Sequence, residues 1–138
     1  HLSIRRQRQM CIRDSYYSKM LGIDLKVTIN GLIDLSNDIE ENVYRIIQEA
    51  MNNVIKHAKT NKVYLDLSQN VEYLEIDIRD NGQGFDTQSI NTFLFNGLKN
   101  IKQRTQYLNG KVTIESKINH GTRIYIKIPL KLKEHPYA

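Results

Sequence analysis

The sequence predicts one α+β domain, a two-layer α/β sandwich in which helices cover one face of a mixed, mostly antiparallel sheet. The 138 residues suffice for a single core. Several segments alternate apolar and polar residues as half-buried strands do, and two repeat apolar residues at helical spacing. The order is strand, helix, hairpin, loop, helix, hairpin. It lacks the repeated strand-helix-strand units of doubly wound nucleotide folds.

The first half of the chain predicts a strand, a long helix and a hairpin. Residues 22–31 (GIDLKVTING) alternate apolar and polar side chains, which is typical of a half-buried strand. Residues 38–59 carry apolar side chains at three- and four-residue spacing, and Asn37 with a glutamate three residues later matches a capping box. Residues 62–69 and 72–80 alternate on either side of a short turn, as the strands of an antiparallel hairpin do.

The second half predicts a loop, a helix and a second hairpin. Residues 86–96 are irregular and read as a loop. Residues 97–110 place apolar side chains on one helical face and stop at Gly110. Residues 111–116 and 122–130 alternate and form the last two predicted strands.

Charge and termini favour a near-neutral globular domain at residues 21–130. Of the net charge of +5, most comes from residues 1–20, which hold five basic side chains and one acid. Their MCIRDS run resembles a translated transposase mosaic end, so we expect an artefact or the remnant of an upstream helix. Residues 131–138 are expected to be a tail. No apolar run is long enough to span a membrane, and the single cysteine excludes an internal disulfide.

Polar residues at two strand ends share the parity of the core. Asp80 follows the inward-facing Leu74, Ile76 and Ile78, and Thr122 precedes inward-facing isoleucines on the last strand. A buried carboxylate needs hydrogen-bond donors, so Asp80 with Thr122 could recognise a planar ring that bears an amine. Asn81-Gly82 alone also matches a tight turn that needs no ligand, and both interpretations stay open.

One edge of the long helix carries Glu49, Asn53 and Lys56 beside the apolar stripe. Glu49 and Asn53 are four residues apart and therefore lie on one face. Their oxygens suit a hard cation such as Mg²⁺, and Lys56 suits a phosphate. A solvated helix edge explains the same residues without a ligand. His57 lies within the apolar stripe and is expected to be a packed or edge histidine.

Four segments resemble the nucleotide-binding boxes of the ATP-binding (GHKL-type) domain of sensor histidine kinases, in the nitrate- and membrane-fluidity-sensor subfamily. YRIIQEAMNNVIKHA resembles the N box, DNGQGFD the G1 box, GLKNIKQR the G2 box and HGTRIYIKIPL the final glycine-threonine strand. Together they cover about residues 22–130 in the family's order. The resemblance implies the Bergerat-type fold, ATP and Mg²⁺ as cofactors, and a protein histidine kinase catalytic domain.

At the purine end, the resemblance implies that Asp80 accepts from the adenine amino group, assisted by Thr122 and a water. Gly82 and Gly84 would let the loop pass against the nucleotide, and Gly121 would belong to the same ATP site. The resemblance thus favours a ligand role for DNGQGFD over a turn alone.

At the phosphate end, Asn53 would hold Mg²⁺, Glu49 would be the catalytic residue that polarises the reacting group, and Lys56 would face phosphate. Gly97 would begin the helix whose N-terminal amides meet the phosphates, with Leu98 beside it. Residues 86–96 would be a short ATP lid. The FNGL sequence lacks one glycine of the family's second glycine box.

The implied partners are the dimerisation and phosphoacceptor domain of a full-length kinase and, through it, a response regulator, with no direct nucleic-acid contact. The domain would be cytoplasmic, also where the full-length protein is membrane-attached. Because none of the chain's histidines matches the family's acceptor, we expect no autophosphorylation by the chain alone. Three alternatives remain: an anti-sigma-factor-type serine kinase, a nucleotide-binding regulatory module of the same fold, and a nucleic-acid binder that uses the basic head.

Overall fold

The structure is a computed structural model that describes residues 23–58, 60, 62–86 and 92–130. Its elements are β1 (Asp24–Asn30), α2 (Asn37–Asn53), a π-helical turn η1 (Val54–Ala58), β2 (Lys62–Gln69), β3 (Tyr73–Asp80), α3 (Thr92–Tyr107), β4 (Lys111–Lys117) and β5 (Gly121–Pro129). The predicted head at residues 1–20 and the tail at 131–138 lie outside the described residues.

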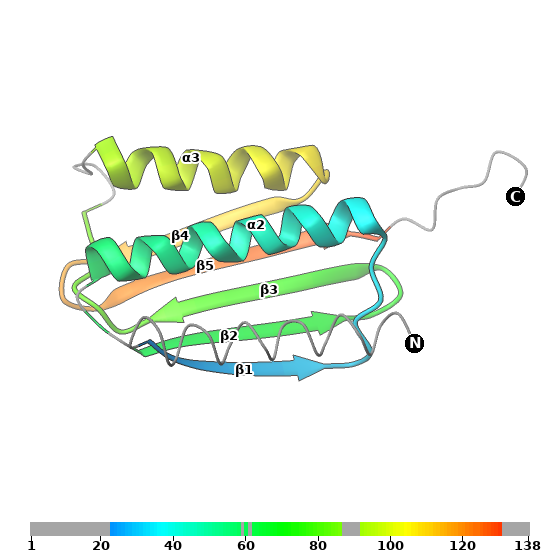
Figure 1. Cartoon of the computed structure of the whole chain (residues 1–138), viewed down its shortest axis with the longest axis horizontal. Coiled ribbons are helices and arrows are strands. Elements are labelled where there is room, and N and C mark those ends of the chain that lie inside the picture. The colour runs from blue at the N-terminus through cyan, green and yellow to red at the C-terminus, as the bar shows by residue number, and fades with distance from the viewer. Residues whose placement is uncertain (1–22, 59, 61, 87–91, 131–138) are drawn as a thin grey trace, which may run out of the picture.

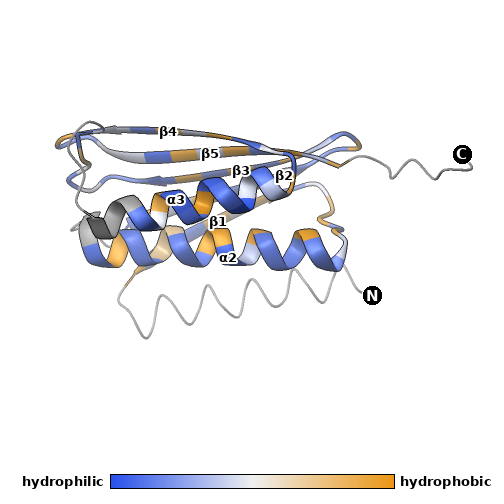
Figure 2. Cartoon of the chain, turned by 90° about the horizontal axis from the view of Figure 1, so that it is seen from above, coloured by the Kyte–Doolittle hydropathy of each residue, from blue (hydrophilic) through white to orange (hydrophobic). Residues whose placement is uncertain are grey.

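The described strands form one five-stranded sheet in the order β1-β2-β3-β5-β4. β1 and β2 pair in parallel, and the other neighbours pair antiparallel. The parallel pair requires a crossover, which α2 provides. α2 and α3 lie side by side on one face of the sheet (Figures 1 and 2). The predicted two-layer α+β sandwich with a mixed, mostly antiparallel sheet is confirmed.

The core lies between the helices and the inner face of the sheet. On β3 the inward side chains Leu74, Ile76 and Ile78 are 3% exposed or less, as the alternation predicts. Ile46 and Met51 of α2 meet them with no exposed surface. Burying one such side chain contributes about 1.5–3 kcal/mol, so this layer fixes where the strands end and therefore where the polar residues at their ends lie.

Both ends of α2 differ in detail from the prediction. The N-cap is Ser36, whose Oγ accepts from the N–H of Ile39 at 3.4 Å, so the predicted capping box at Asn37 was wrong. Ser36 has extended backbone (φ −64°, ψ 158°), the conformation that an N-cap needs. At the other end the predicted α-helix to residue 59 stops at Asn53 and continues as the π-helical turn.

The second helix begins earlier than expected. α3 starts at Thr92, so residues 92–96 of the predicted loop are helical and Gly97 does not begin the helix. Residues 92–96 contain neither glycine nor proline, so their sequence offers no stop signal. At the far end Asn109 takes the left-handed conformation (φ 60°), and the Gly110 N–H donates to the Thr105 carbonyl at 2.9 Å, which closes the helix.

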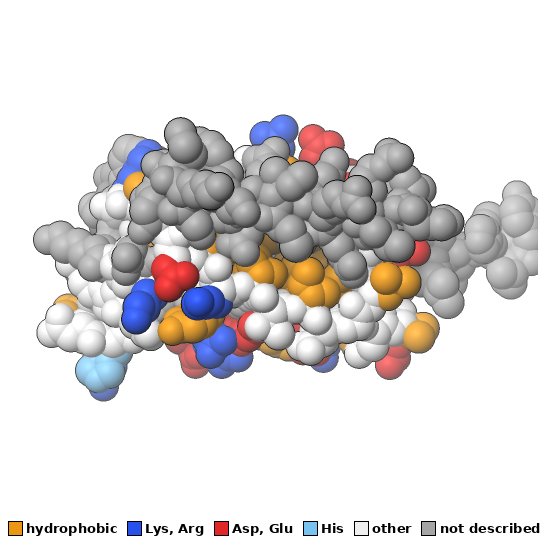
Figure 3. Space-filling view, turned by 60° about the horizontal axis from the view of Figure 1, so that its bottom comes forward, with side chains coloured by type: hydrophobic (Ala, Val, Ile, Leu, Met, Phe, Trp, Pro, Cys, Tyr) orange, Lys and Arg blue, Asp and Glu red, His pale blue; other side chains and the backbone are white. Residues whose placement is uncertain are grey.

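The outer face of the sheet carries a ladder of ion pairs. Arg79 of β3 reaches Asp66 at 2.8 Å, and Arg123 of β5 reaches Asp77 at 2.9 Å. On the surface that Figure 3 shows, acidic and basic side chains also lie among one another rather than in a field of one sign. A phosphate-backbone binder needs a basic stripe, so the described residues give the nucleic-acid alternative no support.

Candidate nucleotide site

Asp80 ends β3 with its side chain turned into the layer between sheet and helices, as its parity predicts. It is 9% exposed. Its Oδ1 accepts from the Gly82 N–H at 2.8 Å, and the Thr122 N–H also bonds the carboxylate. Burial raises the pKa of Asp80 above its ordinary value, and the two backbone N–H groups oppose that rise. The Asp80 side chain thus holds the start of the loop through Gly82. The tight turn predicted at Asn81-Gly82 was wrong, because neither residue takes the positive φ that such a turn needs.

Thr122 and Ser116 stand beside Asp80 on the neighbouring strands. Thr122 is the register partner of both Asp80 on β3 and Ser116 on β4. The two hydroxyl oxygens are 2.8 Å apart. Ser116 Oγ also accepts from the Phe85 N–H at 2.8 Å and donates to the Gly121 carbonyl at 3.2 Å. A carboxylate and two hydroxyls thus gather at one end of three adjacent strands.

The glycine-rich loop is held by the β4–β5 hairpin. Gly84 has φ +63°, and a Cβ there would overlap the Lys117 carbonyl oxygen. Gly121 has φ +88°, and a Cβ there would overlap the Asp80 carbonyl oxygen. The Asn119 N–H donates to the Gln83 carbonyl at 2.6 Å. Both glycines are therefore required by contacts within the protein, whatever ligand approaches the loop.

The polar edge of α2 faces α3 in the region of Gly97. A Cβ on Gly97 would lie 2.7 Å from Oδ1 of Asn53 and 3.3 Å from Oε2 of Glu49. Asn100 of α3 donates to Glu49 Oε1 at 3.4 Å. Asn53 Nδ2 is buried and has no hydrogen-bond partner in the part of the chain that the structure describes. A buried amide without a partner is costly in free energy, which fits a side chain kept for a ligand.

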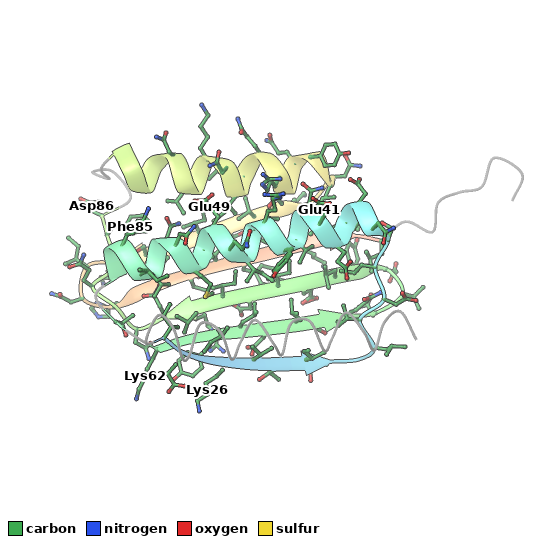
Figure 4. The ribbon with its side chains drawn as sticks, in the orientation of Figure 1. Lys26, Glu41, Glu49, Lys62, Phe85 and Asp86 are labelled. Atoms are coloured by element: carbon green, nitrogen blue, oxygen red, sulfur yellow. The ribbon has the colours of Figure 1, made fainter. Side chains whose placement is uncertain are left out.

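The structure brings most of the predicted site residues to one end of the molecule. β3 ends there, α2 ends there and α3 begins there (Figure 1). Glu49 lies between the two helices, and Phe85 and Asp86 lie at the same end (Figure 4). The buried Asp80 carboxylate and the polar helix edge around Asn53 therefore share one end of the fold (Figure 1).

The predicted site residues Leu98 and Lys56 differ in their burial. Leu98 is buried in the hydrophobic core at 6% exposure, beside the glycine that contacts α2. Lys56 is exposed on the π-helical turn, so the α-helical spacing that predicted one shared edge with Glu49 and Asn53 does not apply to it. The side chain of His57 lies outside the described residues.

A hollow of about 330 Å³ also opens at this end of the sheet. Besides Asp80 and Thr122 it is lined by Arg79, Glu115 and Arg123, which belong to the outer face. Among the described residues, none of α2 or α3 lines this hollow. We therefore do not assign it to the nucleotide, whose predicted metal ligand lies on α2.

The chain matches a known protein family over most of its described residues. The family model of the histidine kinase-, DNA gyrase B-, and HSP90-like ATPases matches residues 38–132, more than half of the chain. The chain belongs to this family. Membership of this ATPase family implies ATP binding, and it places the buried carboxylate and the polar helix edge within the family's domain.

Three similar proteins are named as histidine kinases or as a sensor protein. The chain is 33% identical over 118 residues to the sensor histidine kinase YhcY of Bacillus subtilis, covering 86% of this chain and 31% of that protein. It is 36% identical over 96 residues to the signal transduction histidine-protein kinase/phosphatase DegS of Brevibacillus brevis, covering 70% and 25%. It is 38% identical over 96 residues to the sensor protein VraS of Staphylococcus saprophyticus, covering 70% and 27%.

The chain thus spans less than a third of the length of these curated relatives. Their names favour the ATP-binding catalytic domain of a two-component histidine kinase over the serine-kinase alternative.

Solved structures agree on the fold. The histidine kinase domain of the Erythrobacter litoralis blue-light activated histidine kinase superposes with a TM-score of 0.64 at 19% identity, covering 94% of this chain and 61% of that one. The Acinetobacter baumannii histidine kinase AdeS gives 0.68 at 13% identity, covering 92% and 64%.

Two site residues were missed by the sequence analysis. Ser116 shares the inward parity of Val112 and Ile114 on β4, so the alternation already marked it as a polar residue on the core face. Asn100 gave no comparable signal, because its role depends on how α3 crosses α2.

Proposed function

We propose that the chain is the ATP-binding catalytic part of a sensor histidine kinase of the nitrate- and fluidity-sensor subfamily, one that presents the γ-phosphate of MgATP to a histidine on a separate dimerisation domain. The observation that supports this most directly is the buried Asp80 carboxylate at the same end of the fold as Glu49 and Asn53. The GLKNIKQR segment and the IPL ending support the finer subfamily assignment.

In this proposal Asp80 accepts a hydrogen bond from the adenine amine, and Thr122 hydrogen-bonds to the same edge of the base. Asn53 holds Mg²⁺ through its amide oxygen. Its buried Nδ2, which has no partner among the described residues, donates to a phosphate oxygen of the same nucleotide. When bound, Mg²⁺ neutralises charge on the phosphates. Glu49 hydrogen-bonds the incoming imidazole and makes it a better nucleophile, while Asn100 orients Glu49.

The remaining predicted roles follow the same division. Gly82, Gly84 and Gly121 shape the purine end, and Lys56 faces phosphate. Gly97 meets the phosphate end from within α3 rather than from its first turn, with Leu98 anchoring that turn in the core. The phosphoacceptor domain of the full-length kinase and its response regulator are the proposed partners, and the proposed location is the cytoplasm. No helix in the described part of the chain has the length and apolarity to cross a membrane.

The function is tested with γ-labelled ATP and Mg²⁺. Incubated alone, the chain is expected to gain no acid-labile label, because the resemblance places the acceptor histidine on another domain. With a purified phosphoacceptor domain of a sensor histidine kinase, label that is acid-labile and base-stable is expected on that domain. Acid-stable phosphate on a serine of a partner would support the serine-kinase alternative, and label retained on the chain itself would contradict the proposal.

The metal role of Asn53 has a matched control in the preceding residue, Asn52, which is exposed. Asn53→Ala is expected to weaken ATP binding in Mg²⁺ by roughly tenfold or more, because one oxygen ligand is lost. Without Mg²⁺ its affinity should equal that of the wild type. Titration calorimetry with and without EDTA measures both, and Asn52→Ala should behave as the wild type in each. Equal losses with and without metal would contradict a metal role for Asn53.

A further inference from the structure

The Ser116 hydroxyl joins three parts of the purine end. It contacts the glycine-rich loop through the Phe85 N–H at 2.8 Å, the hairpin through the Gly121 carbonyl at 3.2 Å, and the Thr122 hydroxyl at 2.8 Å. Its residue is half-buried on the inner face of β4. Nothing in the role of Asp80 requires this contact set.

The number of hydrogens decides which way the two hydroxyls point. A serine hydroxyl has one hydrogen and two lone pairs. The Phe85 N–H can only donate, so it takes one lone pair of Ser116, and the Gly121 carbonyl can only accept, so it takes the hydrogen. The remaining lone pair faces Thr122, whose hydroxyl must then donate. This is the single arrangement in which all three contacts are hydrogen bonds at once.

Once its hydrogen points at Ser116, Thr122 offers only lone pairs to a ligand. The ionised Asp80 carboxylate beside it also offers only acceptors. A base that presents an amine to both groups gains two hydrogen bonds. A base with a carbonyl oxygen in that place meets acceptors alone.

We propose that Ser116 is a positioning residue that sets the Thr122 hydroxyl as an acceptor and thereby makes the site select a 6-amino purine over a 6-oxo purine. This inference rests on the proposed function, because it assumes that the base of ATP lies against Asp80 and Thr122. Ser116 itself touches no part of the nucleotide in this proposal.

The test compares ATP with inosine triphosphate, which carries an oxygen in place of the amine, at fixed Mg²⁺. In Ser116→Ala the Thr122 hydroxyl loses its acceptor and is free to donate to the carbonyl of inosine. The ratio of ATP to inosine triphosphate affinity is therefore expected to fall about fivefold or more, the factor that one ordinary hydrogen bond provides. Thr113→Ala, which removes an exposed hydroxyl from the same strand, should leave the ratio unchanged.

A purely structural role for Ser116 would weaken both nucleotides alike and leave the ratio as it is, and that result would overturn the inference. In a Thr122→Val background, Ser116→Ala should no longer change the ratio, since the hydroxyl it acts through is gone. A change that persists there would also overturn it. If Ser116→Ala does not fold, Ser116→Cys keeps nearly the same volume with a weaker hydrogen-bonding group and should lower the ratio in the same direction.

Failure of the two proposals can be told apart. If the wild type does not bind ATP, or if Asp80→Asn binds it as the wild type does, the proposed purine site is wrong and this inference falls with it. If the wild type and Asp80→Asn behave as expected while Ser116→Ala leaves the ratio unchanged, only the role of Ser116 is wrong.

Discussion

Asp80→Asn is expected to weaken ATP binding roughly 10- to 100-fold, the loss that follows from removing a hydrogen bond to a charged acceptor. The amide retains the shape of the carboxylate but carries an NH₂ group, which meets the adenine amine as donor against donor. Titration with a fluorescent ATP analogue measures the loss. Asp77→Asn is the matched control, because Asp77 lies on the same strand, faces outward and pairs with Arg123. Equal losses from the two variants would contradict the assignment of Asp80 to the base.

The same variant is expected to gain stability as the pH rises. Burial raises the pKa of Asp80 above 3.8, so the folded chain holds this proton at pH values where the unfolded chain has released it. The contribution of Asp80 to stability is therefore fully present below pH 3.8 and is lost as the pH rises through the folded pKa. Asp80→Asn avoids that decline, so its free energy of unfolding should increase relative to the wild type between pH 4 and 8. Urea unfolding across this range measures the difference, and an opposite trend would contradict burial as the dominant influence on the pKa of Asp80.

Gly121→Ala is expected to destabilise the fold by on the order of 3 kcal/mol or more and to abolish ATP binding. The added methyl group would overlap the Asp80 carbonyl oxygen, and alanine is strained at φ +88°. The backbone of Asp80 cannot move away from the added methyl group without breaking the pairing of Asp80 with Thr122. The loss of folding free energy therefore combines backbone strain at residue 121 with lost strand pairing. Thermal unfolding should show a midpoint lower by roughly 10 °C.

Asn119→Gly in the same hairpin is the control for Gly121→Ala. Asn119 has φ +66°, so glycine removes conformational strain there and adds no atom. Its stability should equal or slightly exceed that of the wild type. A Gly121→Ala variant as stable as the wild type would mean that the hairpin does not press on the end of β3.

The sequence predicted those features that depend on local alternation. The five strands, the two-layer arrangement and the inward direction of Asp80 follow from residues at every second position, and the structure confirms them. The long helix was equally plain from its apolar spacing, apart from its cap and its final π-helical turn. These features can be predicted from the order of side chains alone, because the burial of one strand face determines which residues point inward.

The features that were wrong or missed depend on contacts between distant segments. The start of α3 at Thr92 could not be predicted, because residues 92–96 contain no glycine or proline that would separate a loop from a helix. The ligand role predicted for Gly84 stays a prediction, but a second reason for this glycine was missed: a side chain there would overlap the carbonyl of Lys117, thirty-three residues further along the chain. Ser116 became a site residue only when β4 lay beside β5 and the loop lay beside both.

The sheet order has a consequence for how this site comes into being. β5 is the last strand of the described chain, yet it lies between β3 and β4, and it supplies Gly121 and Thr122. When synthesis has reached the end of α3, all residues of the predicted N box and G1 box are present, but Gly121 and Thr122 of the proposed site are not. The proposed site is complete only when β5 inserts between β3 and β4, so a chain that ends before β5 leaves β4 without its neighbour in the sheet.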